Sequence, residues 1–145
     1  MAKTKINVKA QTKGMQSIIK AGKHTITIDE PAAMGGKDTG ADPLSALLSA
    51  LAGCENVIAN FVAKEIEFDL QGIEFEITGV LDTRGLMGNP DVKPYFEKVR
   101  IDAKVNTSET QERIDQLQKS TDERCPVFTT FKAAGIELDV NWTKA

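Results

Sequence analysis

Two cysteines are the residues of this chain whose chemistry could carry a reaction. Cys54 lies inside the apolar stretch SALLSALAGCENVIANF, and Cys125 precedes a proline in ERCPVFTTF. A thiolate is a strong nucleophile, and its oxidation product, a sulfenic acid, condenses with a second thiol to a disulfide. From the residues alone three interpretations are open: two inert core thiols, a redox pair, or half of a metal site.

Metal and cofactor sites are not indicated by the spacing of the possible ligands. The chain has 1 His and 2 Cys, and neither cysteine belongs to a CxxC pair, which a structural zinc site would use. The glycine pair Gly35 and Gly36 is not followed by the GK[ST] sequence of a phosphate-binding loop. We therefore expect no metal and no cofactor.

Composition limits the class of protein. A chain of 145 residues with 41% hydrophobic and 27% charged residues is typical of a globular domain, and we predict one domain over residues 1–145. A net charge of -3 argues against nucleic acid as the main partner. No apolar run approaches the roughly 20 residues that span a bilayer, and no signal peptide is indicated. We expect a cytoplasmic protein that does not bind membranes.

A long helix is predicted to hold Cys54. Asp42 and Pro43 are typical of a helix start, and the helix should run to about Lys64. Polar residues share one narrow stripe at helical spacing: Ser45, Ser49, Gly53, Asn56, Asn60 and Lys64. The remaining circumference is mostly apolar, so we expect the helix to be buried on most sides. Cys54 lies opposite the stripe. The side chain of Glu55 should point about 100° away from that of Cys54.

The rest of the chain predicts an α+β fold. Alternating polar and apolar residues indicate a small β-meander at 5–11, 15–22 and 24–29, then two long antiparallel strands within 66–82 and 95–107. A second helix should begin at Ser108, with Gln111 completing a capping box. Pro126 should break it near Glu123 and Arg124, Gly135 should end the second part, and 136–142 should form a last strand.

The two thiols are expected to differ in reactivity. A helix that restarts at Pro126 places Cys125 at a helix N-terminus beside Arg124, where a thiolate is favoured. Apolar burial disfavours a thiolate at Cys54, which would need a cation brought from elsewhere. The residues alone leave both cysteines open to the interpretation of inert core thiols.

Three segments resemble the OsmC/Ohr family, named for osmotically inducible protein C and organic hydroperoxide resistance protein. They are DEPAAMGGKDTGADPLSALLSALAGC (29–54), LDTRGLMGNPDV (81–92) and ERCPVFTTF (123–131). The helical ALAGC together with a distant CPV is the specific part of the match. The loop around Arg84 is typical of the OsmC-like branch.

The resemblance implies a thiol-dependent peroxidase that reduces organic hydroperoxides. Cys54 becomes the thiol that attacks the peroxide, and Cys125 becomes the thiol that resolves the resulting sulfenic acid. The family also implies an intertwined homodimer with two active sites, and small dithiols or lipoyl-bearing proteins as the reductant.

The sequence departs from the family at the residues that activate the first thiol. Family enzymes use an early Arg held by a Glu near the start of the central helix, but this chain has no Arg before Arg84 and has Ser45 at the Glu position. Arg84 and Lys13 are the candidate cations, and Lys lacks the planar fork of Arg. The alternative function is therefore a non-enzymatic, small-molecule-binding dimer with weak or no peroxidase activity.

Overall fold

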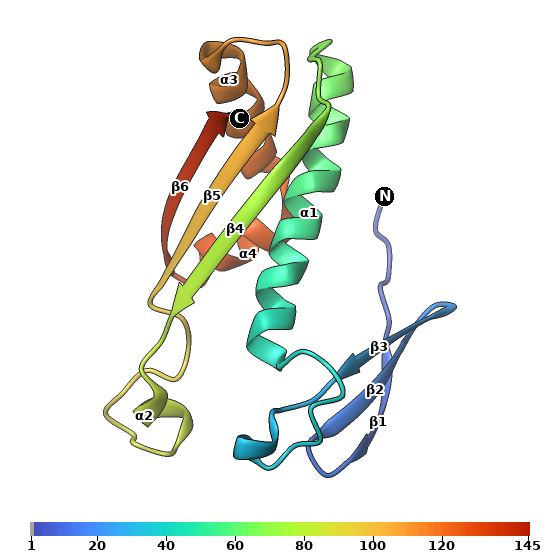
Figure 1. The fold of residues 1–145 in the computed structure, drawn as a ribbon, viewed down its shortest axis with the longest axis vertical. Helices are drawn as coiled ribbons and strands as arrows, with labels where there is room; N and C mark the ends of the chain where they lie inside the picture. Colours follow the sequence, from blue (N-terminus) through green and yellow to red (C-terminus); the bar gives the residue numbers. More distant parts are fainter. Residues whose placement is uncertain (1) are drawn as a thin grey trace. The chain divides into compact units, whose positions relative to one another are not determined.

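The structure of the protein, a computed structural model, describes residues 2–145 and has mixed α+β architecture (Figure 1). The chain divides into two compact units, one ending at Leu47 and the other spanning Leu48–Ala145. Helix α1, Pro43–Glu65, begins in the first unit and continues through the second. The α+β fold class is confirmed, and the assignment of residues 1–145 to a single domain stays a prediction.

The first unit contains the predicted β-meander. Its antiparallel strands are joined by two-residue turns that begin at glycines with positive φ, and they comprise β1 (Lys9–Lys13), β2 (Gln16–Ala21) and β3 (His24–Ile28). The prediction of a first strand at 5–11 was wrong by several residues. The register pairs Lys9 with Lys20, and β2 ends one residue later, so residues before Lys9 have no strand to pair with.

The loop between β3 and α1 is held by the buried carboxylate of Asp29. Its oxygens accept hydrogen bonds from Thr39 Oγ1 at 2.7 Å, Glu30 N at 2.8 Å and Thr39 N at 3.2 Å. These bonds favour the charged form and lower the pKa of Asp29 to about 2. The short helix η1, Ala32–Met34, lies within this loop. The segment is therefore an ordered connection into α1.

Helix α1 is buried along one face. Asp42 caps its start, accepting a hydrogen bond from Ser45 N at 3.0 Å. The buried side chains recur at helical spacing and are Leu51, Glu55, Ala59, Val62 and Ala63. The predicted polar stripe is exposed, but so are the apolar side chains of Leu44, Leu47, Val57 and Phe61, which are 40–55% exposed. Burial of α1 within the described chain is thus narrower than the sequence predicts.

By length and composition alone α1 could cross a membrane, contrary to the expectation that no apolar run is long enough. A single helix of this kind is weak evidence, because the core helix of a soluble protein meets the same two criteria.

The second unit is built on a three-stranded sheet in the order β4-β5-β6. Strands β4 (Gly72–Val80) and β5 (Lys98–Asn106) are antiparallel, as predicted, and β6 (Glu137–Lys144) runs parallel to β5. Alternate residues of β5 are buried, namely Val99, Ile101, Ala103 and Val105. They pack in two apolar clusters with side chains of α1, α3 and α4. The helices therefore cover one face of this sheet (Figure 1).

The second helical region is broken where proline predicts. Helix α3 spans Gln111–Arg124 and α4 spans Pro126–Ala133. The predicted cap at Ser108 was wrong, because Thr110 caps α3 and Ser108 donates its hydroxyl to Asp69 at 2.6 Å instead. The loop between β4 and β5 contains a short helix, α2, Thr83–Leu86.

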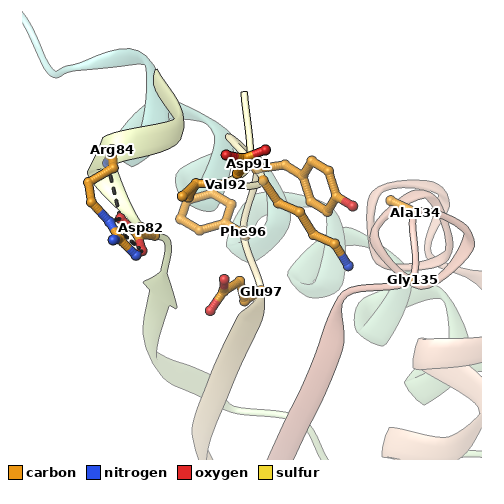
Figure 2. Close-up of a pocket in the computed structure, with 10 residues that line it drawn as sticks. Asp82, Arg84, Asp91, Val92, Phe96, Glu97, Ala134 and Gly135 are labelled. Atoms are coloured by element: carbon orange, nitrogen blue, oxygen red, sulfur yellow. Dashed lines mark hydrogen bonds and ion pairs between the residues drawn. The ribbon is translucent and has the colours of Figure 1, made fainter. Parts of the chain in front are cut away.

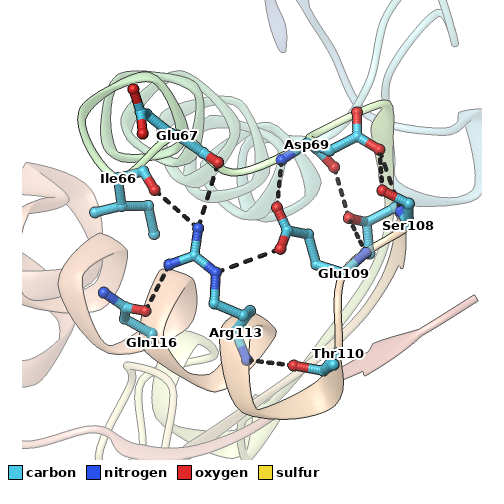
Figure 3. A network of polar contacts seen from close by, with 9 residues as sticks. Ile66, Glu67, Asp69, Ser108, Glu109, Thr110, Arg113 and Gln116 are labelled. Carbon is cyan, nitrogen blue, oxygen red and sulfur yellow. Dashed lines mark hydrogen bonds and ion pairs between the residues drawn. The ribbon is translucent and has the colours of Figure 1, made fainter.

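Arg113 joins the start of α3 to the segment that follows α1 (Figure 3). Its guanidinium donates to Ile66 O at 2.8 Å, to Gln116 Oε1 at 2.8 Å and to Glu109 Oε1 at 3.3 Å. It also lies over the ring of Phe68, 5.8 Å from the centroid. One side chain thus satisfies backbone carbonyls left open at the C-terminus of α1.

Candidate thiol site

The fold brings the two cysteines together within the second unit. Cys54 lies on α1 and is half-buried, whereas Cys125 lies between α3 and α4 and is fully buried. Both belong to the apolar cluster that includes Leu51, Phe96 and Phe128. The Cys54 thiol is close enough to raise the pKa of Cys125, and neither cysteine is in a disulfide. The two cysteines are far apart in sequence, and the packing of α3 and α4 against α1 brings them close together in space.

Cys125 occupies the helix break in two roles. Its N–H donates to Thr121 O at 2.9 Å, which ends α3, and its Sγ accepts from Phe128 N at 3.4 Å, which caps α4. Pro126 follows at the first helical position, where a missing N–H costs nothing. A small side chain that can accept a hydrogen bond is favoured at this N-cap position.

The thiol of Cys125 does not become the thiolate that its helix position suggests. Burial raises the pKa of Cys125 to about 12, and hydrogen bonding with Cys54 adds to the effect, while the bond from Phe128 N opposes it. Arg124 does not offset the burial, because it forms an ion pair with Glu65 in which Nη1 and Oε2 are 2.6 Å apart. The expectation that the helix N-terminus and Arg124 favour a thiolate was wrong, since desolvation dominates.

A buried carboxyl group, Glu55, is the residue of this site that sequence reasoning missed. Glu55 is 0% exposed, and neither of its carboxyl oxygens has a hydrogen-bond partner among the described residues. Burial, then the neighbouring Asp122 carboxyl, raise the pKa of Glu55 to about 9, while the nearby Cys125 thiol opposes the rise. Glu55 is therefore neutral at pH 7 and lies next to the Cys125 thiol.

Asp122, one turn before Cys125 on α3, completes the carboxyl pair. Its Oδ1 is buried without a donor, and its Oδ2 accepts from Gln118 Nε2 at 3.4 Å. Burial raises the pKa of Asp122, whereas hydrogen bonds from Glu55 and Gln118 lower it. One proton on Glu55, donated to Asp122, satisfies both buried groups at once.

Helical spacing contains the signal for Glu55. It lies four residues after Leu51 and four before Ala59, both of which are buried at 0% exposure. The sequence places Glu55 away from Cys54 on the helix, and that direction is the one that α3 and α4 cover.

Arg84 lies in the loop after β4 and is paired with Asp82 (Figure 2). Its Nε lies 3.0 Å from Asp82 Oδ1, and its side chain is 68% exposed. The two residues line a cavity of about 620 Å³ that also includes Phe96 and Glu97. Every hydrogen bond and ion pair of the Arg84 guanidinium within the described part of the chain is to Asp82, so none joins it to a thiol.

Lys13 lies in the first unit, at the exposed end of β1. The roles of Lys13 and Arg84 as activating cations stay predictions. Among residues 2–145, no three His, Cys, Asp or Glu side chains are placed to hold one metal ion.

Known proteins resemble this chain in sequence and in fold. The family model described as OsmC-like protein matches residues 36–141. A hydroperoxide reductase of Mycoplasma pneumoniae is 31% identical over 108 residues, which are 72% of each chain. The crystal structure of an OsmC-like protein from the same organism has a TM-score of 0.86 at 22% identity and covers 100% of both chains.

The fold extends to more distant proteins. The crystal structure of the organic hydroperoxide resistance protein OhrB of Bacillus subtilis has a TM-score of 0.65 at 22% identity, covering 96% of this chain and 98% of that one. The assignment to a family rests on sequence as well as on fold. The family model matches residues 36–141, and one relative is more than 30% identical. The protein belongs to the OsmC-like protein family.

Proposed function

We propose that the protein is a thiol-dependent peroxidase that reduces organic hydroperoxides. The observation that carries the proposal is that a half-buried thiol, Cys54, packs against the apolar cluster that contains a fully buried one, Cys125. A substrate can reach the first thiol, and the second is held ready beside it. The hydroperoxide reductase of Mycoplasma pneumoniae, as a relative of this chain, supports a peroxidase-like activity.

The reaction balances in two steps. The Cys54 thiolate attacks the distal oxygen of ROOH, the O–O bond breaks, and the departing alkoxide takes a proton to give ROH and Cys54–SOH. The Cys125 sulfur then attacks the Cys54 sulfur, the S–O bond breaks, and water leaves as the disulfide forms. Each cycle transfers two electrons from the thiols to the peroxide.

An external dithiol must return the disulfide to two thiols. Thiol–disulfide exchange through a mixed disulfide does this without a bound cofactor. We propose a small dithiol or a lipoyl-type protein as the reductant, and the cytoplasm, a reducing compartment, as the location.

The surroundings of Cys54 favour an organic peroxide. Apolar side chains of the same cluster, including Leu48, Ile58 and Val127, are only partly buried and lie around the thiols. An alkyl or acyl chain can bury its surface against them, at about 25 cal/mol per Å² of apolar area. Hydrogen peroxide has no such group and gains nothing from them.

A homodimer is part of the proposal. Val57 and Phe61 on α1 are 50% and 55% exposed in the described chain, although both are large and apolar. Packing α1 against a second copy would remove that surface from water.

The activating cation is the open part of the mechanism. We propose that Arg84 or Lys13 stabilises the Cys54 thiolate within the assembled protein. Replacing that residue by Met should slow alkylation of Cys54 at pH 7, whereas Met at the other position should leave the rate unchanged. If neither substitution slows alkylation, this part of the proposal is wrong.

Mass spectrometry after one equivalent of an organic hydroperoxide tests the function. We expect the wild type to lose two mass units as the disulfide forms, and Cys125→Ser to gain one oxygen at Cys54. Cys54→Ser should not consume peroxide. An unreactive Cys54 in the folded wild type would remove the peroxidase proposal.

The alternative function is a small-molecule-binding dimer without peroxidase activity. Two observations favour it: the carboxyl pair beside the thiols disfavours a thiolate, and the cavity of about 620 Å³ is lined by Arg84, Asp82 and Phe96 but by neither cysteine. Ligand binding that persists in a Cys54→Ser, Cys125→Ser variant, together with an inert Cys54, would establish it.

A further inference from the structure

The Cys125 thiol has no direct route to water for its proton. Cys125 is 0% exposed and is covered by the apolar side chains of its cluster. Its attack on a Cys54 sulfenic acid requires that the thiol proton leave, and burial makes that loss costly. Some neighbouring group must accept the proton during the attack.

Glu55 is the group in place to accept it. It is 0% exposed, and both of its carboxyl oxygens, like Oδ1 of Asp122, are buried without a hydrogen-bond partner among the described residues. The Asp122 carboxyl and the Cys125 thiol are close enough to shift its pKa. A neutral carboxyl group has one acceptor oxygen and one O–H donor, so it can take a proton on one side while giving one on the other. The groups that face it are Asp122 of α3, Cys125 at the α3–α4 junction and Cys54 of its own helix.

Asp122 connects the pair to the surface. It is only partly buried, and its Oδ2 accepts from Gln118, which is also partly exposed. The charged groups that influence it are Glu55, Glu123 and Lys132. A proton passed to Asp122 can therefore reach water, which a proton left on Glu55 could not.

We propose that Glu55 and Asp122 form a proton relay for the resolving step, an inference that rests on the proposed peroxidase function. As the Cys125 sulfur attacks the Cys54 sulfur, the thiol proton moves to Glu55, and the Glu55 O–H proton moves to Asp122. The hydroxide that leaves Cys54 takes a proton from the relay or from solvent and departs as water. Glu55 touches a reacting atom, whereas Asp122 acts through Glu55.

Glu55→Gln tests the relay, because the amide keeps the shape of the side chain and cannot pass a proton in this way. In quenched-flow mass spectrometry we expect disulfide closure to slow by about 10- to 100-fold, in the range of general acid–base effects. Sulfenic acid formation at Cys54 should slow much less, so sulfenic and sulfinic acid accumulate. Glu112→Gln, the same change at an exposed position of α3, is the matched control and should close at the wild-type rate.

The pH profile separates a relay from a structural effect. Closure in the wild type should depend weakly on pH near neutrality, because the pair accepts the proton. The rate of disulfide closure in Glu55→Gln should rise about tenfold per pH unit, because hydroxide must then remove the proton of the Cys125 thiol. Asp122→Asn should show the same slope and serves if Glu55→Gln does not fold. Parallel profiles for the variants and the wild type would overturn the relay.

A second oxidant separates this inference from the proposed function. Diamide joins the two thiols without a peroxide, and closure through it also requires deprotonation of the second thiol. Slower diamide closure in Glu55→Gln supports the relay even if hydroperoxides are not consumed, whereas unchanged closure with both oxidants rejects it. Infrared difference spectra of wild type against Glu55→Gln should also show the band of a protonated carboxyl at pH 7; its absence counts against the relay.

Discussion

Cys54 and Cys125 are chemically alike but differ in their surroundings. The first is half-buried on a helix face, and the second is sealed at a helix junction. Order of oxidation follows from this difference, because a peroxide can contact only the more accessible sulfur. In Cys125→Ser we expect sulfenic acid at Cys54 to persist and to become sulfinic acid with excess peroxide, as peptide mass spectrometry would show. Oxidation at residue 125 of a Cys54→Ser variant at the same rate would contradict this order.

Glu55 predicts how stability depends on pH. Its pKa is about 9 in the folded protein against an ordinary value of 4.5 for Glu, so the folded state binds more protons between these limits. The contribution of Glu55 is therefore complete below pH 4.5 and is lost as pH rises through about 9. Relative to Glu55→Gln, the wild type should lose stability over this range, by at most about 1.4 kcal/mol per pH unit. Urea titrations at several pH values measure the difference, and a constant difference would show that Glu55 is not buried in its neutral form.

At the scale of secondary structure elements, α1 is the part on which the second unit depends. Leu51 is 0% exposed against the cluster that holds Cys125. We expect Leu51→Asp to destabilise the protein by more than about 3 kcal/mol, because it buries an unpaired charge. Asn56→Asp on the exposed stripe of the same helix is the control, with an effect within about 0.5 kcal/mol. Denaturant unfolding followed by circular dichroism distinguishes them, and equal effects would mean that α1 is not packed as described.

A second prediction at this scale concerns Arg113, whose side chain connects the segment after α1 to the start of α3. Its hydrogen bonds to Ile66 O and Glu109 and its contact with Phe68 are lost together in Arg113→Ala (Figure 3). We expect a loss of about 2 kcal/mol of unfolding free energy. Arg100→Ala, at an exposed ion pair of β5 with Asp102, should lose less than about 1 kcal/mol. A smaller loss at Arg113 than at Arg100 would refute the role of this network.

For the whole molecule, the exposed apolar side chains of α1 predict self-association. Phe61→Asp should leave the fold intact, because Phe61 is 55% exposed in the described chain, and should raise the dimer dissociation constant about 100-fold or more. Asn60→Asp, the neighbouring exposed residue, should leave it unchanged. Light scattering coupled to size-exclusion chromatography reads both outcomes. A wild type that is monomeric at micromolar concentration would end the dimer proposal.

Local signals in the sequence determined much of the fold. Asp42 with Pro43 marked the start of α1, Pro126 marked the break beside Cys125, and alternation marked β4 and β5, because caps, proline and strand periodicity act over a few residues. Strand ends were less certain, and β1 begins at Lys9 because its partner ends at Ala21.

Tertiary structure alone decided the character of the thiol site. The sequence identified Cys54 and Cys125 through a family resemblance, but the helix start at Pro126 favoured a thiolate at Cys125, and the burial of Glu55 and Asp122 was not identified. Burial by α3 and α4 raises the pKa of both Cys125 and Glu55, and desolvation depends on which distant segments cover a residue. Periodicity shows which face of a helix is apolar. Which charged side chain that face encloses depends on contacts between segments far apart in the chain.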